Sequence, residues 1–255
     1  MKKLNIFTLL LILFAASFTG CKDDEETPAA TPETGQFNIN FNHVWGMNNL
    51  PFQMNKMIKH PMTGDSLEFT TYKYYISNIK LKDANGDWWS EDESYHLVDL
   101  SLADGNILNI QNVPAGEYSA IQYTHGVDSV RNFSGAQEGA LSILNQMFWS
   151  WNTGYIMVKA EGNSPQSKMG HFKYHLGGYE GENNIVTNKM NEFGSSTLHI
   201  SDDDTHTVNM SVNPAKMWHT VGTMSGKKTM IMMPGDTAKI MATDLFGATA
   251  FLSID

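Results

Sequence analysis

Apolar and polar residues alternate along most of the chain from about residue 36 onward. The clearest example is 37–42, in which Phe37, Ile39 and Phe41 alternate with asparagines. Because successive side chains of a strand point to opposite faces, this pattern predicts a strand with one buried and one polar face. Similar patterns begin near residues 72, 96, 106, 118, 155, 171, 197 and 207. Many short strands separated by turns predict an all-β fold, and we expect an antiparallel β-sandwich.

Turn and helix signals lie between these strands. The pair Asn85-Gly86 is typical of a hairpin turn. Residues 137–147 place leucines and a methionine at helical spacing. Pro214 suits the first position of a helical turn over 214–218, and Pro234-Gly235-Asp236 suits the start of a helix over 237–245. We therefore expect a few short helices beside the strands.

Residues 1–20 have the features of a secretory signal. Lys2 and Lys3 precede an apolar run over 6–18, which is too short to span a bilayer comfortably. The segment ends in Phe18-Thr19-Gly20-Cys21, which resembles a bacterial lipobox and implies cleavage before Cys21 and lipid attachment to its thiol. The alternative is an unmodified cysteine after an ordinary signal. An unpaired thiol is a liability in an oxidising compartment, so we expect lipidation and membrane anchoring.

We expect three segments: a signal peptide over 1–20, a tether over 21–35 and one β-sandwich domain over 36–255. After Cys21 the tether continues with Lys22-Asp23-Asp24-Glu25-Glu26 and a run rich in proline, threonine and alanine. Such a segment buries too little apolar surface to fold. Its acidic run resembles the surface-export signal of some Gram-negative lipoproteins, and a solvated leash explains it equally well. We expect an outer-membrane lipoprotein, on the periplasmic face or at the cell surface.

Charge and cysteine content exclude several classes of function. The chain has 17 basic and 27 acidic residues, and removal of Lys2 and Lys3 leaves 15 against 27, a net charge of −12. Nucleic-acid binding needs clustered basic residues, so we expect no nucleic-acid partner. Cys21 is the only cysteine. If it is lipidated, the mature domain has no disulfide and no cysteine-ligated metal.

Histidines are the strongest candidate metal ligands in the sequence. His171, Lys173 and His175 alternate along one predicted strand and share a face. Imidazoles on one strand face suit copper or zinc without any sulfur ligand. His43, at the end of the first strand, and His96, on another strand, are further candidates for a second ligand. The alternative is that these side chains simply hydrogen-bond to neighbouring backbone groups.

Tryptophans offer a second kind of candidate site. Trp149 and Trp151 are two residues apart and would share one strand face, and Trp89 belongs to a separate Trp88-Trp89 pair. Large aromatic pairs most often fill a core. The functional alternatives are an aromatic wall around a metal, an oxidation site or a platform for sugar rings.

The chain contains 16 methionines, and two groups of three lie close together in sequence. Met230, Met232 and Met233 form one of these groups. Thioethers favour Cu(I), but methionine also fills irregular cores, and Met230 and Met232 have strand spacing. From the spacing we expect these side chains to belong to the core.

Three blocks between residues 123 and 178 resemble the MbnP-like domain, a β-rich family named for a methanobactin-associated periplasmic copper-binding protein. The blocks are Gly126-Val127-Asp128 with Asn132, then 147–155 running on to Lys159-Ala160-Glu161-Gly162, and Tyr174-His175-Leu176-Gly177-Gly178. The resemblance implies a copper site with two histidines and a tryptophan oxidised to kynurenine by a dihaem peroxidase-like partner. It assigns one ligand to His175, in the His-Leu-Gly motif.

This chain departs from the family pattern at the second ligand. The resemblance implies a Trp-x-His motif just before a Leu-Leu-Asp strand. Here neither Trp88 nor Trp89 has a histidine two residues later, and His96 follows at a greater distance, beside Leu97-Val98-Asp99. The family pattern therefore supports half of the expected metal site.

No motif for nucleophilic catalysis or phosphate binding occurs in the sequence, so we expect a binding protein and not an enzyme. Our first hypothesis is a lipid-anchored extracytoplasmic protein that binds copper for sequestration or handover. The alternative hypothesis is a surface lipoprotein that binds carbohydrate or protein without a metal. Its exposed aromatic surface would come from Trp45, Trp88, Trp89 and Trp218.

Overall fold

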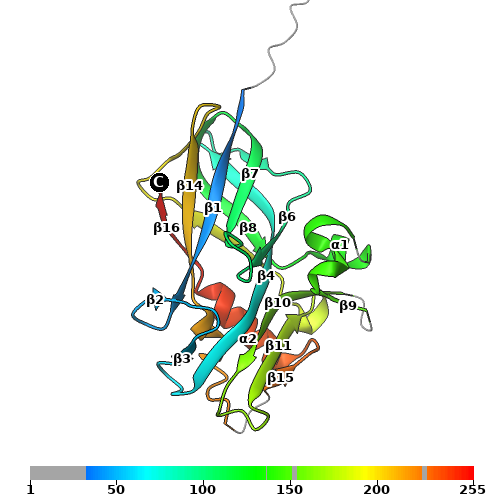
Figure 1. Cartoon of the computed structure of the whole chain (residues 1–255). Coiled ribbons are helices and arrows are strands. Elements are labelled where there is room, and N and C mark those ends of the chain that lie inside the picture. The colour runs from blue at the N-terminus through cyan, green and yellow to red at the C-terminus, as the bar shows by residue number, and fades with distance from the viewer. Residues whose placement is uncertain (1–32, 136, 151–153, 226–228) are drawn as a thin grey trace, which may run out of the picture. The chain divides into compact units, whose positions relative to one another are not determined.

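The computed structural model describes residues 33–135, 137–150, 154–225 and 229–255, so residues 1–32, with the signal and Cys21, lie outside the described residues. The described part is mostly β, with two mixed sheets and two α-helices (Figure 1). It is not the simple antiparallel sandwich that we expected. Two strand pairs, β1 with β14 and β11 with β15, are parallel. Alternation predicts a strand and its buried face, but it does not predict the strand's partner or direction.

The smaller sheet has strand order β16-β14-β1-β2, and β7 also pairs with β1. The predicted alternation in β1 is confirmed, because Phe37, Ile39 and Phe41 are fully buried while the asparagines between them are partly exposed. Its strands are β1 (Thr34–Trp45), β2 (Leu50–Pro51), β7 (Ile107–Pro114), β14 (Thr205–Val212) and β16 (Ala250–Ile254).

The larger sheet has 11 strands and follows the order β12-β8-β4-β10-β11-β15. It curls strongly around its long strand β4, which spans 18 residues and exchanges partners along its length (Figure 1). Its strands are β3 (Met57–Lys59), β4 (Ser66–Asp83), β5 (Trp88–Ser90), β6 (Tyr95–Asp99), β8 (Gly116–His125), β9 (Phe148–Trp149), β10 (Gly154–Asn163), β11 (His171–Gly177), β12 (Thr187–Glu192), β13 (Leu198–Ile200) and β15 (Met230–Ile231).

Helical segments are short, as expected. The helices are α1 (Ser129–Phe133) and α2 (Asp236–Gly247), and the 3₁₀ turns are η1 (Gly139–Leu141), η2 (Ile143–Asn145), η3 (Gly181–Asn183) and η4 (Pro214–Trp218). The predictions over 214–218 and 237–245 are confirmed. The predicted helix over 137–147 is wrong, because Ser142 is extended between two separate turns and Leu144 is 85% exposed. No helix within the described ranges is long and apolar enough to cross a bilayer.

Aromatic side chains build the core where the inner faces of the two sheets meet. Phe41 of β1 packs edge-on against Tyr74 of β4 and Tyr123 of β8. Helix α2 closes the core, and its Phe246 stacks on His125 with a ring separation of 4.2 Å. The side chains of β4 and β10 that point away from this core therefore form the outer face of the larger sheet.

Candidate functional site

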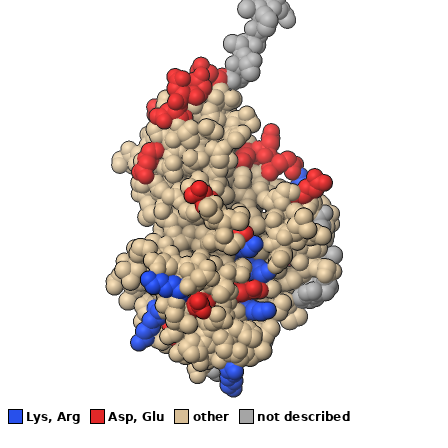
Figure 2. Space-filling view, viewed as in Figure 1, with Lys and Arg blue, Asp and Glu red and all other residues tan. Residues whose placement is uncertain are grey.

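Charged side chains form a row across the outer face of the larger sheet. The register places Asp99 of β6, Lys73 of β4, Lys159 of β10 and His175 of β11 side by side. Neighbours of these residues in sequence, such as Tyr74, Val158 and Tyr174, are buried in the core, so the alternation turns the charged groups to the other face of the sheet. In Figure 2, basic and acidic residues gather where Figure 1 shows these strands.

His175 and Glu161 make the closest contact in this row. The Nε2 atom of His175 lies 2.7 Å from Oε1 of Glu161, and His175 is only 7% exposed. Burial lowers the pKa of His175, although Glu161 partly opposes this effect. Burial alone would raise the pKa of Glu161, but the hydrogen bond from His175 and the charge of Lys159 lower it. Near pH 7 a neutral imidazole therefore donates its Nε2 proton to an ionised carboxylate, which leaves the lone pair on Nδ1.

Lysines surround this pair. Lys159 is 7% exposed and donates from Nζ to the carbonyl of Gln146 at 3.2 Å, and burial lowers its pKa. Lys73 forms a 2.7 Å ion pair with Asp99. Burial alone would raise the pKa of Asp99, but Lys73 and neighbouring hydrogen bonds hold it low. The row is therefore a partly buried network of mixed charge.

His171 lies on the same face of β11 as His175 but is not its neighbour. The two are four residues apart with Lys173 between them, and a strand rises about 3.3 Å per residue, so their Cα atoms are about 13 Å apart. This spacing is too large for both imidazoles to bind one ion. The shared face that the sequence predicts is present, but the pair does not form a site by itself.

His43 and His96 lie on the other side of the larger sheet. Nε2 of His43 is 3.1 Å from the hydroxyl of Tyr74, on the core-facing side of β4, and burial lowers its pKa to about 4. His96 pairs with the buried Ile76 across β4 and β6, and its Nε2 is 2.8 Å from Oε2 of Glu91. The expected meeting of His43 with His175 does not occur, because the sheet separates them.

The structure places Trp149 near His175 and Trp89 far from it. A Cβ atom built on Gly177 would lie 2.5 Å from the ring of Trp149, so this ring covers the backbone two residues after His175. Trp89 pairs with Leu81 at the other end of β4. Trp151 lies outside the described residues. Among the described tryptophans, Trp149 is therefore the candidate that packs on β11 near His175.

Among the described residues, His175 and its neighbours do not complete a metal site by themselves. Within the described ranges no three side chains of histidine, cysteine, aspartate or glutamate lie close enough together to hold a metal ion. The His175–Glu161 pair nevertheless has the arrangement found in metalloproteins, where a ligand imidazole donates its second N–H to a carboxylate. It fits a site in which His175 is one ligand, Glu161 orients it, and other groups complete the coordination.

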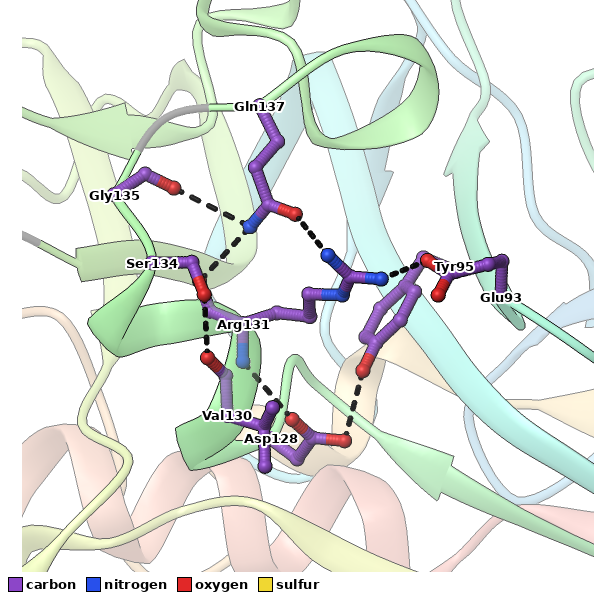
Figure 3. A network of polar contacts seen from close by, with 8 residues as sticks. All are labelled: Glu93, Tyr95, Asp128, Val130, Arg131, Ser134, Gly135 and Gln137. Carbon is purple, nitrogen blue, oxygen red and sulfur yellow. Dashed lines mark hydrogen bonds and ion pairs between the residues drawn. The ribbon is translucent and has the colours of Figure 1, made fainter.

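Another block that carries the family resemblance has a structural role, shown in Figure 3. Asp128 caps α1 by accepting a hydrogen bond from the backbone N–H of Arg131, and it also accepts one from the hydroxyl of Tyr95. Arg131 in turn contacts Glu93 and Gln137. Burial and the bond to Asp128 raise the pKa of Tyr95 to about 12. This network holds α1 against β6 and makes no metal site.

The comparisons with known proteins identify the family. The sequence profile of MbnP matches residues 34–233. The chain belongs to the MbnP family. MbnP proteins are associated with methanobactin and copper and are regarded as non-catalytic, in line with our expectation of a binding protein. The solved structure of MbnP from Methylosinus trichosporium is 15% identical, with a TM-score of 0.49 over 75% of this chain and 83% of that one. No curated protein matches the chain.

Sequence reasoning did not identify Glu161 and Lys159 as neighbours of His175. Both belong to Lys159-Ala160-Glu161-Gly162, which carries part of the resemblance but had no assigned role. Charged residues that alternate in an otherwise apolar strand were the available signal. The pairing of Lys159 with His175, which brings Glu161 within reach, depends on the β10–β11 register.

Proposed function

We propose that this protein is an extracytoplasmic copper-binding member of the MbnP family, acting in sequestration or handover. The observation that carries the proposal is the 2.7 Å contact between His175 and Glu161. Glu161 fixes the imidazole so that Nδ1 is the ligand atom, and burial keeps the ring neutral and ready to bind. Lysines beside this pair oppose the charge of a bound cation and so favour reversible binding.

Copper binding by residues 22–255 should depend strongly on His175. We expect His175→Ala to lose the tight copper equivalent, because the ligand itself is removed. Glu161→Gln should weaken binding about 10- to 100-fold, since it removes only the orienting partner. Titration of Cu(I) and Cu(II) against a competing chelator measures both effects.

The matched control is His199→Ala. His199 also faces a glutamate on a neighbouring strand, but its Nδ1 is 3.6 Å from Glu117 and its side chain is 56% exposed. We expect this variant to bind copper like the unmodified protein. If His175→Ala also keeps its affinity while His96→Ala loses it, the Glu91-paired histidine is the ligand and our assignment is wrong.

The cellular setting that we propose follows from the N-terminus and the family resemblance. Lipid on Cys21 would anchor the protein in the outer membrane, facing the periplasm or the cell surface. A dihaem peroxidase-like partner would act on a tryptophan, for which Trp149 is the described candidate beside His175. Mass spectrometry of the native protein tests both modifications, as added acyl chains on Cys21 and, on a tryptophan, the net gain of one oxygen and loss of one carbon that conversion to kynurenine produces.

A second candidate function, carbohydrate binding, has support from a cavity beside Trp89. The cavity has a volume of about 310 Å³ and is lined by Trp89, Glu91, Asp92 and three amide side chains of β7, those of Asn109, Gln111 and Asn112. The amide side chains of β7 lie beside those on the polar face of β1, and Asn109 of β7 donates a hydrogen bond to Asn38 of β1 at 3.1 Å. An aromatic ring beside amides and carboxylates matches the apolar faces and hydroxyl groups of a sugar.

Trp89→Ala should abolish any quenching of tryptophan fluorescence by neutral oligosaccharides. Trp88→Ala is the control, because Trp88 is adjacent in sequence, points to the opposite face and is 39% exposed. Equal quenching in both variants would refute a sugar site at Trp89. Trp45 and Trp218, which the sequence offered as exposed platforms, are 5% and 1% exposed and cannot stack on a ligand.

A further inference from the structure

Three methionines lie in or directly after β15, the last strand in the order of the larger sheet. Met230, Met232 and Met233 are 39%, 38% and 59% exposed, whereas Ile231 among them is 6% exposed. All three methionines line one cavity of about 330 Å³ between β15 and the start of α2, and Asp236 also lines it. The expectation that they fill the core is therefore wrong for this group.

The sequence predicted the wrong location because it does not show where the sheet ends. β15 pairs with β11 on one side and is the last strand in the order of its sheet. Ile231 pairs with the buried Tyr174 and turns into the core, so Met230 turns outward beside Lys173. The strand spacing of Met230 and Met232 is thus the spacing of an exposed face.

Large apolar side chains are normally buried, and three of them at one exposed cavity need a reason. Their common chemistry is the thioether, a soft sulfur donor that is uncharged and does not take up a proton. Soft sulfur donors select Cu(I) over divalent ions such as Zn(II), which prefer nitrogen, oxygen or thiolate ligands. The carboxylate of Asp236 at the cavity wall adds a negative charge that favours a cation.

We propose that Met230, Met232 and Met233 form a site for a soft monovalent metal ion, Cu(I) or its analogue Ag(I). The site is separate from the His175–Glu161 pair and does not depend on it. The strand register aligns Met230 of β15 with Lys173 of β11, and Lys173 with Glu161 of β10. His175 lies on β11, the strand that pairs with β15. A soft-metal site therefore lies one strand away from the imidazole site, on the same face of the sheet.

Ag(I) is the first probe, because it does not change oxidation state in air. Residues 22–255 are titrated with Ag(I) against a competing ligand. We expect Met230→Leu/Met232→Leu/Met233→Leu to lose one equivalent, or to bind it at least tenfold more weakly. Leucine keeps the size and apolar character of methionine, so the exposed positions tolerate it. Unchanged Ag(I) binding by this triple variant would overturn the proposal.

The control is Met57→Leu/Met62→Leu/Met169→Leu, which removes thioethers that are 49%, 52% and 58% exposed elsewhere on the surface. We expect Ag(I) binding to be kept in this variant. Equal losses in the two triple variants would mean scattered thioether binding and would refute a defined site. The single variant Met233→Leu, at the most exposed of the three positions, gives the same test with the smallest change.

Two further measurements separate this proposal from copper binding at His175. His175→Ala should keep the Ag(I) equivalent, and the Met230 triple variant should keep the Cu(II) equivalent. Lowering the pH from 7.5 to 5 should leave the affinity for Ag(I) unchanged, because thioethers do not titrate. Loss of Ag(I) binding in His175→Ala would assign the silver to imidazole and contradict a thioether site.

Discussion

Gly162→Ala is expected to lower the free energy of unfolding by about 3 kcal/mol. A Cβ atom at this position would lie 1.8 Å from the carbonyl oxygen of Glu68 and 2.8 Å from Cζ of Phe172. The closest atom belongs to the backbone of β4, next to a register shift between Glu161 and Gly162. It cannot move aside without breaking the β4–β10 ladder, which carries the charged row. Urea unfolding followed by circular dichroism measures the loss.

Gly247→Ala is the matched control for this substitution. Gly247 is the last residue of α2, and a Cβ built there meets no heavy atom within 4 Å. Alanine is the better helix former, so we expect unchanged or slightly raised stability, by less than about 1 kcal/mol. Similar midpoints for the two variants would show that β10 can shift to admit a methyl group, contrary to our expectation.

The second large effect is a loss of stability in acid caused by His125. This side chain is 1% exposed, and neither ring nitrogen has a hydrogen-bond partner within the described ranges. Burial and, to a smaller extent, the charge of Lys189 lower its pKa from 6.5 to about 3. Between these values the unfolded chain binds a proton and the folded protein does not. The free energy of unfolding should therefore fall as the pH falls, by up to about 1.4 kcal/mol per pH unit.

His125→Phe isolates this contribution. The ring stacked on Phe246 is kept, while the titrating group and two unpartnered nitrogen atoms are removed. We expect unchanged or raised stability at pH 7 and a shallower loss between pH 6.5 and 4.5, a window above the ordinary pKa of carboxylates. Denaturant unfolding at several pH values gives the two slopes. Equal slopes in the variant and the unmodified protein would assign the acid sensitivity to other groups.

The alternation of apolar and polar residues correctly predicted which face of a strand is buried, but it did not predict which strands pair with each other. In β1 it identified Phe37, Ile39 and Phe41 as core residues, because burial depends on a strand's own pattern. It could not predict the parallel partner of β1, which is more than 160 residues away. The same limit explains the sandwich prediction. Direction and order of strands depend on long-range pairing, and several pairings satisfy the same pattern.

The candidate site shows the same division between local and long-range information. The family motif pointed to His175, and the structure gives it a carboxylate partner that no spacing rule indicated, since Glu161 is 14 residues away. The sequence offered His43 and His175 as candidate ligands of one metal ion, but they lie on opposite sides of β4. The methionine group was misplaced for a related reason, because the pattern of a core strand and that of a sheet edge are alike.

The position of β1 has a consequence for how the protein is made. It is the first strand of the domain, yet it lies between β7 and β14, and Gln36 pairs with Thr205. The smaller sheet therefore cannot close until most of the chain has been synthesised. Pairing over such a distance is also slow, because a long loop must be ordered first. In a growing chain, the edge of β1 that pairs with β14 therefore stays unpaired until residues 205–212 have been synthesised, whereas β4, β8, β10 and β11 can pair with one another earlier.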